Sequence, residues 1–327
     1  MKKVCILLAL CLVLTGCAAT PKQYTLTNLG VFDTVTTIVG TAETEEQFHE
    51  IATGIFEQLY QYHRLFDIYN DYEGINNLKT VNDNAGVAPV VVDSAIIQLL
   101  LDCRGYYELT GGMVNVAMGS VLSLWHEART HGLANPDEAK LPDEAALTSA
   151  MEHCSIENIV IDEENSTVYI CDPLASLDVG AVAKGWAAQR VAESAPGGLL
   201  ISVGGNVCAT GAKSDGTPWV VGVQNPAGGD YLNKISVTGG AVVTSGDYQR
   251  TYTVDGKDYH HIIDPATGMP AQNWRSVTVV CADSALADVL STALFLLPLD
   301  EGRALAEQCG ARVLWLDKSG EIFSTLE

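Results

Sequence analysis

One stretch of the chain, residues 241–271, constrains the fold more than any other. Within it, Asp255-Gly256 separates two segments rich in Thr, Tyr, Val and Ile, residues 249–254 and 257–263. An Asp-Gly pair in such a setting is the strongest short-range signal for a β-hairpin. The base of this hairpin holds more small and polar residues than a turn requires, namely Thr244, Ser245, Gly246, Asp247, His260, His261, Asp264, Thr267 and Gly268. The stretch therefore predicts antiparallel strands that end either in an exposed polar base or in a functional site.

The rest of the chain predicts strands and helices in separate groups. Runs of β-branched and apolar residues predict strands at residues 29–39, 158–162, 167–171, 199–203, 219–223, 276–281, 312–316 and 321–324. Helical spacing of apolar residues predicts helices at 44–69, 95–110, 181–194, 285–297 and 303–309, with a polar loop at 70–84. Because most strands have hairpin-like neighbours, we expect an α+β fold with antiparallel sheets and flanking helices, and not a doubly wound parallel sheet.

The N-terminus has the pattern of an export signal. Lys2 and Lys3 precede an apolar segment, residues 4–14, that is too short to span a bilayer comfortably. The segment ends in Leu14-Thr15-Gly16-Cys17, which resembles the lipobox of bacterial lipoproteins; an ordinary secretory signal with an incidental Cys is the alternative. We therefore expect a signal peptide at 1–16, a lipidated Cys17, a tether at 17–25 and one domain at 26–327. The protein would then be extracytoplasmic and anchored to the cell membrane by acyl chains.

The acidity of the chain narrows its partners. A formal net charge of −22 excludes nucleic acid and electrostatic attachment to anionic lipid. An anionic ligand needs local cations or a metal ion to overcome this field. Six cysteines follow the signal region, at positions 103, 154, 171, 208, 281 and 309. Their wide spacing and apolar neighbours predict buried free thiols, and the His and Cys spacing does not match a zinc site.

An apolar helix at residues 285–297 carries an unexpected acidic residue, Asp288. Thr292 follows four residues later, so both side chains project from one face of the helix. A buried carboxylate is unfavourable unless it is paired or binds a metal ion, and two hard oxygen ligands suit Mg²⁺. The pattern predicts a Mg²⁺ site, with a solvated or helix-capping Asp288 as the alternative.

A second element, residues 178–185, reads DVGAVAKG. Gly180 permits close approach of a ligand to the backbone, and the start of the helix that follows, near Ala181, offers free N–H groups to a phosphate. Lys184 adds a positive charge on the first turn. This pattern is neither a Walker A loop nor GxGxxG, and the VGGN segment at 203–206 is explained more simply as a turn at the end of a strand.

Together these segments resemble the ApbE family of FAD:protein FMN transferases. The resemblance rests on motifs that occur in order from Phe32 to Thr292: FDTVTTI, FDIY, TGGMVNVAMG, LDVGAVAKGWAA, SVGGN, VVTSGDYQR, HHIIDPATGMP and ALADVLSTA. It implies an ApbE-like fold and Mg²⁺-dependent transfer of FMN from FAD to a Thr or Ser hydroxyl of a target protein, with release of AMP. The implied targets are exported flavin-carrying redox proteins, such as Nqr-type Na⁺-pumping quinone reductase subunits, Rnf-type subunits or proteins with an FMN-binding domain.

The resemblance also implies roles for individual residues. Mg²⁺ is expected to bind the side chains of Asp288 and Thr292 and the backbone carbonyl of Ala181. FAD is expected to contact Phe32, Tyr69, Met113, Val114, Asn115, Asp178, Lys184 and Ile262. His261 matches the histidine proposed to act in catalysis, and its ordinary pKa lies near neutrality. Asp264 is expected either to orient that imidazole or to fix the DPATG turn.

The chain departs from the family pattern at three places. Glu73-Gly74 stands where members often have Ser-Glu, Asn115 where they usually have Asp, and Ser291 where some have a further Asp near the metal. Asn115 keeps a hydrogen-bond acceptor but carries no charge, so any acid role there is lost. Two other functions stay open: a hydrolase that splits FAD into FMN and AMP, and a non-catalytic flavin-binding or solute-binding lipoprotein.

Overall fold

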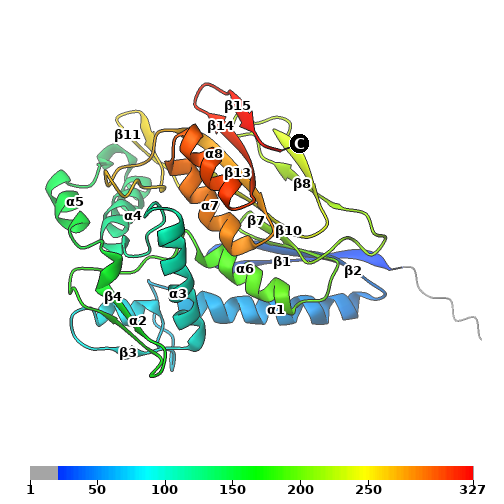
Figure 1. The fold of residues 1–327 in the computed structure, drawn as a ribbon, viewed down its shortest axis with the longest axis horizontal. Coiled ribbons are helices and arrows are strands. Elements are labelled where there is room, and N and C mark those ends of the chain that lie inside the picture. Colours follow the sequence, from blue (N-terminus) through cyan, green and yellow to red (C-terminus); the bar gives the residue numbers. More distant parts are fainter. Residues whose placement is uncertain (1–20, 327) are drawn as a thin grey trace, which may run out of the picture.

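The computed structural model describes residues 21–326, so the predicted signal peptide at 1–16 and Cys17 lie outside the described residues. An eight-stranded sheet in the order β1-β2-β6-β7-β10-β13-β14-β15 forms the centre of the fold (Figure 1). Every neighbouring pair in this sheet is antiparallel, which confirms the predicted α+β class. The strands are β1 (Lys22–Val31), β2 (Thr34–Ala42), β6 (Leu199–Val203), β7 (Asn206–Ala209), β10 (Gly240–Gly246), β13 (Trp274–Cys281), β14 (Arg312–Asp317) and β15 (Ile322–Ser324).

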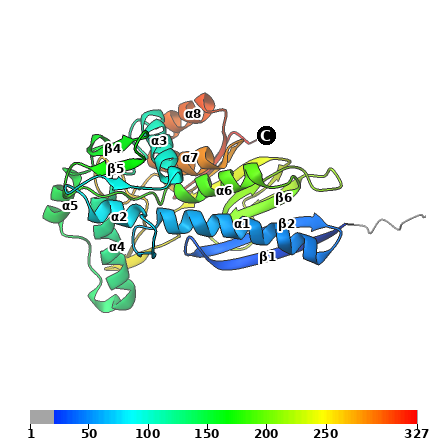
Figure 2. The same cartoon turned by 90° about the horizontal axis from the view of Figure 1, so that it is seen from below.

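Helices lie along one face of this sheet (Figure 2), and the side chains of a hairpin pack on the other face. The helical layer consists of α1 (Glu45–Phe66), α6 (Ala183–Ser194), α7 (Ser284–Leu296) and α8 (Leu299–Gln308). The hairpin consists of β8 (Trp219–Val223) and β9 (Asn233–Val237). Because side chains alternate along a strand, Val243 and Val279 pack with the helices, whereas Val242 and Val280 pack with the hairpin. The central strands are therefore covered on both faces.

A second lobe of shorter elements lies at the left of Figure 1. Its helices are α2 (Leu78–Asp83), α3 (Ser94–Leu109), α4 (Gly119–Ala134) and α5 (Glu144–Met151), with 3-10 turns at Pro136–Glu138 and Ile156–Asn158. Its strands are β3 (Val90–Val91), β4 (Ile159–Asp162) and β5 (Thr167–Ile170), ordered β3-β5-β4, and the pair β11 (Tyr252–Val254) and β12 (Lys257–Tyr259). Buried side chains that include Trp125, Leu147 and Tyr252 join α4, α5 and β11.

The predicted hairpin around Asp255-Gly256 is confirmed, with shorter arms than expected. β11 pairs with β12 from Tyr252 opposite Tyr259 to Val254 opposite Lys257. The φ angles of Asp255 and Gly256 are 50° and 78°, as a two-residue type I′ turn requires. The helices predicted at 44–69, 95–110 and 285–297 are α1, α3 and α7. Each helix is capped at its start by a side chain that accepts a backbone N–H of the first turn. The capping residues are Thr44, Asp93 and Asp283, respectively.

Three predictions about the first 84 residues are wrong. Residues 29–39 are not one strand, because Phe32 and Asp33, with φ of 51° and 50°, form the turn between β1 and β2. β1 begins at Lys22, so residues 22–25, predicted as tether, belong to the sheet. The polar loop predicted at 70–84 contains α2, which begins with a reciprocal capping box between Asn77 and Thr80.

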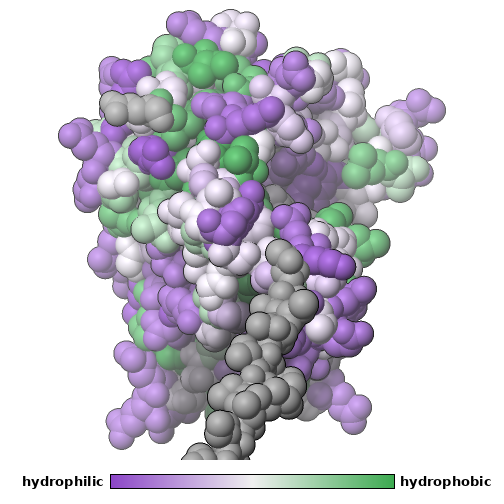
Figure 3. Space-filling model, turned by 90° about the vertical axis from the view of Figure 1, so that its right-hand side faces the viewer, coloured by the Kyte–Doolittle hydropathy of each residue, from purple (hydrophilic) through white to green (hydrophobic). Residues whose placement is uncertain are grey.

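The cysteines among the described residues are unpaired, and the surface is mainly hydrophilic on the face shown in Figure 3. The six cysteines are free thiols; Cys103 and Cys208 are buried as predicted, whereas Cys171 is exposed. No helix within residues 21–326 is both long and apolar enough to cross a membrane. On the face in Figure 3, hydrophilic side chains predominate and hydrophobic ones are scattered between them, in keeping with the acidity of the chain.

Candidate active site

One cleft lies where the sheet and its helices meet the second lobe. Its walls come mainly from β10, α4, α6, α7, the segment before α6 and the segment after β12. It brings together most of the predicted site residues, namely Tyr69, Met113, Val114, Asn115, Asp178, Ala181, Lys184, His261, Ile262, Asp288 and Thr292. Phe32 and Asp264 do not line it. Motifs that are far apart in the sequence therefore meet at one place.

Close packing of α6 on α7 builds one end of the cleft. A Cβ atom on Gly185 would lie 2.4 Å from the Cβ of Asp288 and 2.5 Å from the carbonyl oxygen of Ser284. Only glycine therefore permits the two helices to approach this closely. The Gly185 N–H donates a 2.8 Å hydrogen bond to Oδ2 of Asp288, a residue that is only 4% exposed. The backbone of α6 thus fixes one oxygen of this buried carboxylate.

A backbone oxygen lies next to this pair of helices. Because α6 begins at Ala183, the Ala181 carbonyl precedes the carbonyls that the helix pairs with its N–H groups. The Gly185 N–H belongs to the first turn, which has no intrahelical partners, and it bonds Asp288. Thr292 lies one turn after Asp288 on α7 and also lines the cleft. A carboxylate, a hydroxyl and a carbonyl therefore border this end, and these are the hard oxygen donors that Mg²⁺ prefers.

Burial makes the negative charge of Asp288 unfavourable. Burial raises the pKa of Asp288, and the Lys184 charge and the Gly185 N–H only partly oppose this effect. Ser291, at the position where some relatives carry Asp, donates to the Asp288 carbonyl and lies 2.8 Å from the hydroxyl of Ser245. Within residues 21–326, no three His, Cys, Asp or Glu side chains gather as a metal-binding group. A cation here would therefore depend on a single carboxylate supported by neutral oxygens.

Asp178 and Lys184 lie on the segment that leads into α6. Oδ1 of Asp178 accepts the Gly180 N–H at 2.8 Å, and Nζ of Lys184 donates to the Gly180 carbonyl at 3.1 Å. Burial raises the pKa of Asp178, and the charges of Arg250 and Lys184 are among those that oppose the rise. The helix begins at Ala183 rather than at the predicted Ala181, so Lys184 occupies its first turn.

Two adjacent histidines have different surroundings. The buried His260 donates from Nε2 to the Ala271 carbonyl at 2.9 Å and accepts the Ile262 N–H on Nδ1 at 3.2 Å. Both of its nitrogens are used, so its role is structural. His261 lines the cleft and donates from Nδ1 to the Gln249 carbonyl at 3.2 Å. A carbonyl only accepts, so the free lone pair of the neutral ring lies on Nε2.

Burial and nearby cations keep His261 neutral. Burial, followed by the charges of Arg250 and Lys184, lowers the pKa of His261 to about 3. The imidazole is therefore uncharged at pH 7. An anion that offsets the charges of Arg250 and Lys184 raises this pKa, so the basicity of His261 is tied to what binds beside it.

Two predicted site residues have other roles. Of the two roles expected for Asp264, the structure shows the turn: its carboxylate accepts the Ala266 N–H at 2.8 Å, and the imidazole of His261 bonds the Gln249 carbonyl and not Asp264. The Asp264 carbonyl also accepts the Gly268 N–H at 2.8 Å, so this residue fixes the DPATG turn. Phe32, expected to contact FAD, packs edge-on against His63 with ring centroids 5.7 Å apart and stays outside the cleft wall.

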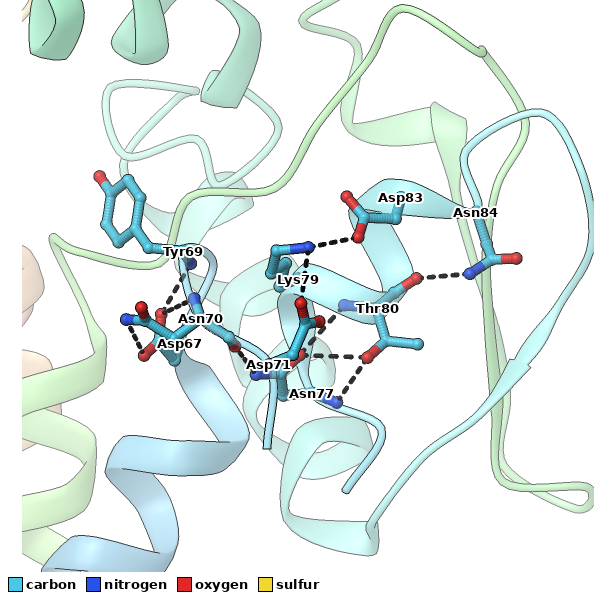
Figure 4. A network of polar contacts seen from close by, with 9 residues as sticks. All are labelled: Asp67, Tyr69, Asn70, Asp71, Asn77, Lys79, Thr80, Asp83 and Asn84. Carbon is cyan, nitrogen blue, oxygen red and sulfur yellow. Dashed lines mark hydrogen bonds and ion pairs between the residues drawn. The ribbon is translucent and has the colours of Figure 1, made fainter. Parts of the chain in front are cut away.

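The turn that ends α1 holds Tyr69 at the cleft. Oδ1 of Asp67 accepts the N–H groups of Tyr69 and Asn70 at 2.7 and 3.0 Å (Figure 4). The Tyr69 ring points away from this network and stacks on His126, with centroids 5.0 Å apart and planes 28° apart. Burial raises the pKa of Tyr69 to about 12, so its hydroxyl stays neutral. Because the residue is 54% exposed, its ring can also stack on a planar ligand.

Residues 113–115 form part of the wall. The N–H of the buried Val114 donates to the Thr110 hydroxyl at 3.2 Å. The Asn115 amide donates to the Cys154 carbonyl at 2.8 Å, and its oxygen accepts the Ala117 N–H at 2.9 Å. Both ends of the Asn115 side chain are therefore occupied, and this residue shapes the wall by holding two backbone segments together.

Among the cleft residues that sequence reasoning missed, four can contact a ligand by charge or by an aromatic ring: Trp125, His126, Arg129 and Arg250. The first three come from α4, and their spacing places them on adjoining parts of one helix face. That spacing was available in the sequence, but nothing in it indicates that this face of α4 meets Tyr69. Arg250 lies at the end of the VVTSGDYQR motif, which indicated the family but gave no role to the charge of this residue.

The fold and the cleft first define the class of protein. It is an α+β protein in which an antiparallel sheet, its helices and a smaller lobe meet at one cleft. The cleft contains a buried and a half-buried carboxylate, three cations and stacked aromatic rings. The chain belongs to the ApbE family, whose pattern it matches over residues 32–315. This finding confirms the family indicated by the sequence motifs.

Individual relatives agree with this assignment. The chain is 32% identical over 259 residues to an FAD:protein FMN transferase from Klebsiella pneumoniae, covering 75% of this chain and 78% of the relative. It is 34% identical over 251 residues to an FAD:protein FMN transferase from Treponema pallidum, covering 71% of this chain and 67% of the relative. The crystal structure of the ApbE protein from Thermotoga maritima is similar, with a TM-score of 0.81 and 30% identity over 93% of this chain and 97% of that one. The flavin transferase ApbE from Vibrio cholerae shares the fold, with a TM-score of 0.76 and 24% identity over 93% of this chain and 97% of that one.

Proposed function

We propose that this protein is an Mg²⁺-dependent FAD:protein FMN transferase. It moves FMN from FAD to a Thr or Ser hydroxyl of a target protein and releases AMP. Relatives that carry this name support the proposal. The observation that carries it is the meeting of Asp288, Thr292 and His261 in one cleft. Oxygen donors for a cation and a base with a free nitrogen are what transfer of a phosphate-linked group to a hydroxyl requires.

The proposed Mg²⁺ site consists of the side chains of Asp288 and Thr292 and the carbonyl of Ala181. The chemistry of these donors fits the ion, and the Ala181 carbonyl, which precedes α6, is not used by the hydrogen bonds of the helix. When bound, Mg²⁺ supplies positive charge that polarises the phosphates and offsets the acidity of the chain. Lys184, on the first turn of α6, adds a fixed positive charge near Asp288.

His261 takes the proton of the acceptor hydroxyl on Nε2, because the Gln249 carbonyl holds Nδ1–H. As this proton moves, the hydroxyl oxygen bonds to the phosphorus of the FMN half, and the bond from that phosphorus to the bridging oxygen breaks. AMP leaves with the bridging oxygen, and FMN remains on the target as a phosphoester. The bound pyrophosphate offsets Arg250 and Lys184 and so raises the pKa of His261 from about 3, which makes the ring a better base in the complex.

The proposed acceptors are exported flavin-carrying redox proteins, of the Nqr or Rnf type or with an FMN-binding domain. The proposed location is outside the cytoplasmic membrane, with lipidated Cys17 as the anchor. The apolar segment 4–14 and the sequence Leu14-Thr15-Gly16-Cys17 support this location. Metabolic labelling with a fatty acid tests it: the wild-type chain should be labelled and the Cys17→Ala chain should not, and a labelled variant would refute the anchor.

The test of activity combines the protein with FAD, Mg²⁺ and a candidate acceptor. The expected result is an acceptor whose mass increases by one FMN, whose flavin fluorescence survives denaturing electrophoresis, and whose flavinylation matches the AMP released. An acceptor with Val in place of the modified Thr is the control and should stay unlabelled. Free FMN without modified acceptor would identify a hydrolase instead, and absence of both FMN and AMP would refute catalysis.

A further inference from the structure

The cleft is locally positive within a strongly acidic protein. Its lining contains the cations Arg129, Lys184 and Arg250 against the carboxylates Asp178 and Asp288. One net positive charge therefore lines a cleft in a chain of net charge −22. Lys184 already bonds the Gly180 carbonyl. The other two cations, Arg129 and Arg250, are called the arginine pair below. The proposed transfer uses the charge of Arg250 only through its effect on His261, and it assigns neither arginine a contact with the substrate.

The arginine pair comes from two different walls. Arg129 belongs to α4 of the second lobe, and Arg250 to the segment between β10 and β11. Within the described chain, neither guanidinium forms a salt bridge with an Asp or Glu. Burial, and next the charge of Arg250, lower the pKa of Arg129. The fold therefore holds two guanidinium groups in one cleft, and among the described residues neither has a salt-bridge partner.

Arg129 is oriented without being neutralised. Its Nη2 donates to Nδ1 of His126 at 3.1 Å. A guanidinium has donors only, so His126 must accept this bond with a lone pair and carry no charge. Burial and the charge of Arg129 lower the pKa of His126, in agreement with a neutral ring. His126 in turn stacks on Tyr69, so the contact fixes the direction of Arg129 and leaves its other N–H groups available.

Arg250 occupies a backbone conformation that its side chain disfavours. Its φ of 49° lies in the left-handed region, which a residue with a Cβ adopts at a cost. Two residues shortly before it are held by contacts with other segments: Asp247 pairs with Lys318 at 2.6 Å, and the Gln249 carbonyl accepts from His261. Such strain persists where the surroundings enforce it, and it concentrates at ligand sites. A solvated surface arginine explains the exposure of Arg250 but not the half-buried, unpaired Arg129 beside it.

We propose that the arginine pair binds a phosphate group of the dinucleotide from both walls of the cleft. This inference rests on the proposed function and deepens it by naming groups that hold the phosphates of its substrate. Guanidinium groups match phosphate oxygens with paired, charge-assisted hydrogen bonds, and a phosphate replaces the missing carboxylate partner of both arginines. The phosphate belongs to the FMN half or to the AMP half of FAD, and the experiment separates these two sources.

The experiment measures binding rather than turnover. The full chain and its Arg129→Gln and Arg250→Gln variants are titrated with AMP, adenosine, FMN and riboflavin in Mg²⁺ at two salt concentrations. Each variant should bind AMP or FMN at least about tenfold more weakly, as loss of a hydrogen bond to a charged group implies, while adenosine and riboflavin change less than about twofold. The affinity for the affected nucleotide should also depend less on salt than in the wild type. Loss for AMP identifies the AMP half, and loss for FMN identifies the FMN half.

Matched variants separate this role from general damage. Arg129→Lys and Arg250→Lys keep the charge without the planar fork and should recover part of the affinity. Arg303→Gln removes an exposed arginine of α8, outside the cleft, and should change nothing. The proposal would be overturned if the affinity for both AMP and FMN were unchanged, or if it fell no further than in Arg303→Gln. It would also be overturned if adenosine and riboflavin lost as much affinity as AMP and FMN. A protein that binds nucleotide through the arginine pair but transfers no FMN would refute the proposed function alone.

Discussion

The two ends of the cleft are built by opposite means. The carboxylate end, made of Ala181, Asp288 and Thr292, lies between two helices packed so closely that Gly185 has no room for a Cβ. The arginine end, made of Arg129 and Arg250 with the Tyr69–His126 stack, joins the second lobe to a strained loop segment. Each end holds charge that the described chain does not neutralise by a salt bridge, negative at one end and positive at the other.

This difference indicates how each end gains from a ligand. At the carboxylate end the Gly185 N–H fixes the buried Asp288 carboxylate, so the only charged ligand of the proposed cation is already positioned. At the arginine end the donors come from two separate elements, so a phosphate oxygen both neutralises them and ties those elements together. His261 responds to both, because Lys184 and Arg250 each lower its pKa.

The largest effect should come from removing the charge of the carboxylate end. Asp288→Asn should lower the rate of FMN transfer about a thousandfold or more, because the proposed cation loses its only carboxylate. The metal-free variant should unfold at a temperature no lower than the wild type, since the substitution removes a buried charge that burial disfavours. Thermal unfolding with and without Mg²⁺ measures both points, and the stabilisation by Mg²⁺ should disappear.

Asp283→Asn is the matched control for this prediction. It makes the same change of charge on the same helix, but Asp283 caps α7 by accepting the Leu286 N–H, a role that Asn fills equally well. Transfer and Mg²⁺ stabilisation should survive in this variant. An Asp288→Asn protein that Mg²⁺ still stabilises would show that the cation binds elsewhere.

The second prediction separates the adjacent histidines. His261→Ala should lower the transfer rate by about 10²-fold or more, as loss of a general base does, with little change in stability. His260→Ala should instead lower the free energy of unfolding by about 2–4 kcal/mol, because it removes two buried hydrogen bonds and an edge contact with Phe295. Transfer rates and urea unfolding should be measured on both variants. His261→Ala should have the larger effect on the transfer rate, and His260→Ala the larger effect on stability. Equal effects of the two substitutions on stability would contradict the structural role of His260.

The carboxylate end was predictable from sequence because it violates a local rule. An Asp in an otherwise apolar helix, with Thr one turn later, places a charge where only apolar residues are expected, and this can be seen in the sequence without the fold. The hairpin at Asp255-Gly256 was predictable for a similar reason, since its turn residues have few other uses. The left-handed turn at Phe32 and Asp33 has a weaker signal, because Phe disfavours a positive φ and no glycine follows Asp33, so the sequence suggested one continuous strand.

The arginine end was not predictable because tertiary packing alone creates it. The spacing of His126 and Arg129 is that of any exposed helical face, and only the packing of the second lobe brings that face to Tyr69. The role of Asp264 was undecided for the same reason. A carboxylate three residues after a histidine can orient it or close a turn, and the choice depends on the Gln249 carbonyl, which reaches His261 from another segment.

A third, smaller effect concerns the packing that creates the carboxylate end. Gly185→Ala should lower the free energy of unfolding by about 1–3 kcal/mol, because the added methyl overlaps Asp288 and the Ser284 carbonyl and pushes α6 from α7. The stabilisation by Mg²⁺ should fall as well, because Asp288 loses the Gly185 N–H contact. Gly105→Ala, on α3 with nothing within 4 Å of the new Cβ, is the control and should be neutral or stabilising by about 0.5–1 kcal/mol. Equal effects of the two substitutions would show that α6 and α7 tolerate a wider separation.

The smallest effect concerns the influence of the arginine end on the pKa of His261. Arg250→Gln should raise the pKa of His261 above about 3, because it removes a positive charge that disfavours the imidazolium, while burial, the larger cause, keeps the pKa below its ordinary value. NMR titration of the imidazole measures this change, with Arg129→Gln as the matched control, since Arg129 is not among the charges that shift His261.

A change in acid stability should accompany the change in pKa. In the wild type, protons bind His261 in the unfolded chain below its ordinary pKa but bind the folded chain only near pH 3, so stability falls as the pH decreases between these values. Arg250→Gln should therefore lose less stability than the wild type as the pH falls from 5 toward 3, where the His261 ring of the folded variant begins to bind a proton and that of the folded wild type does not, as urea unfolding at several pH values in this range measures. If Arg129→Gln raised the pKa of His261 by the same amount, the two arginines would act on the base as one unit, and the separation between the ends of the cleft would not hold.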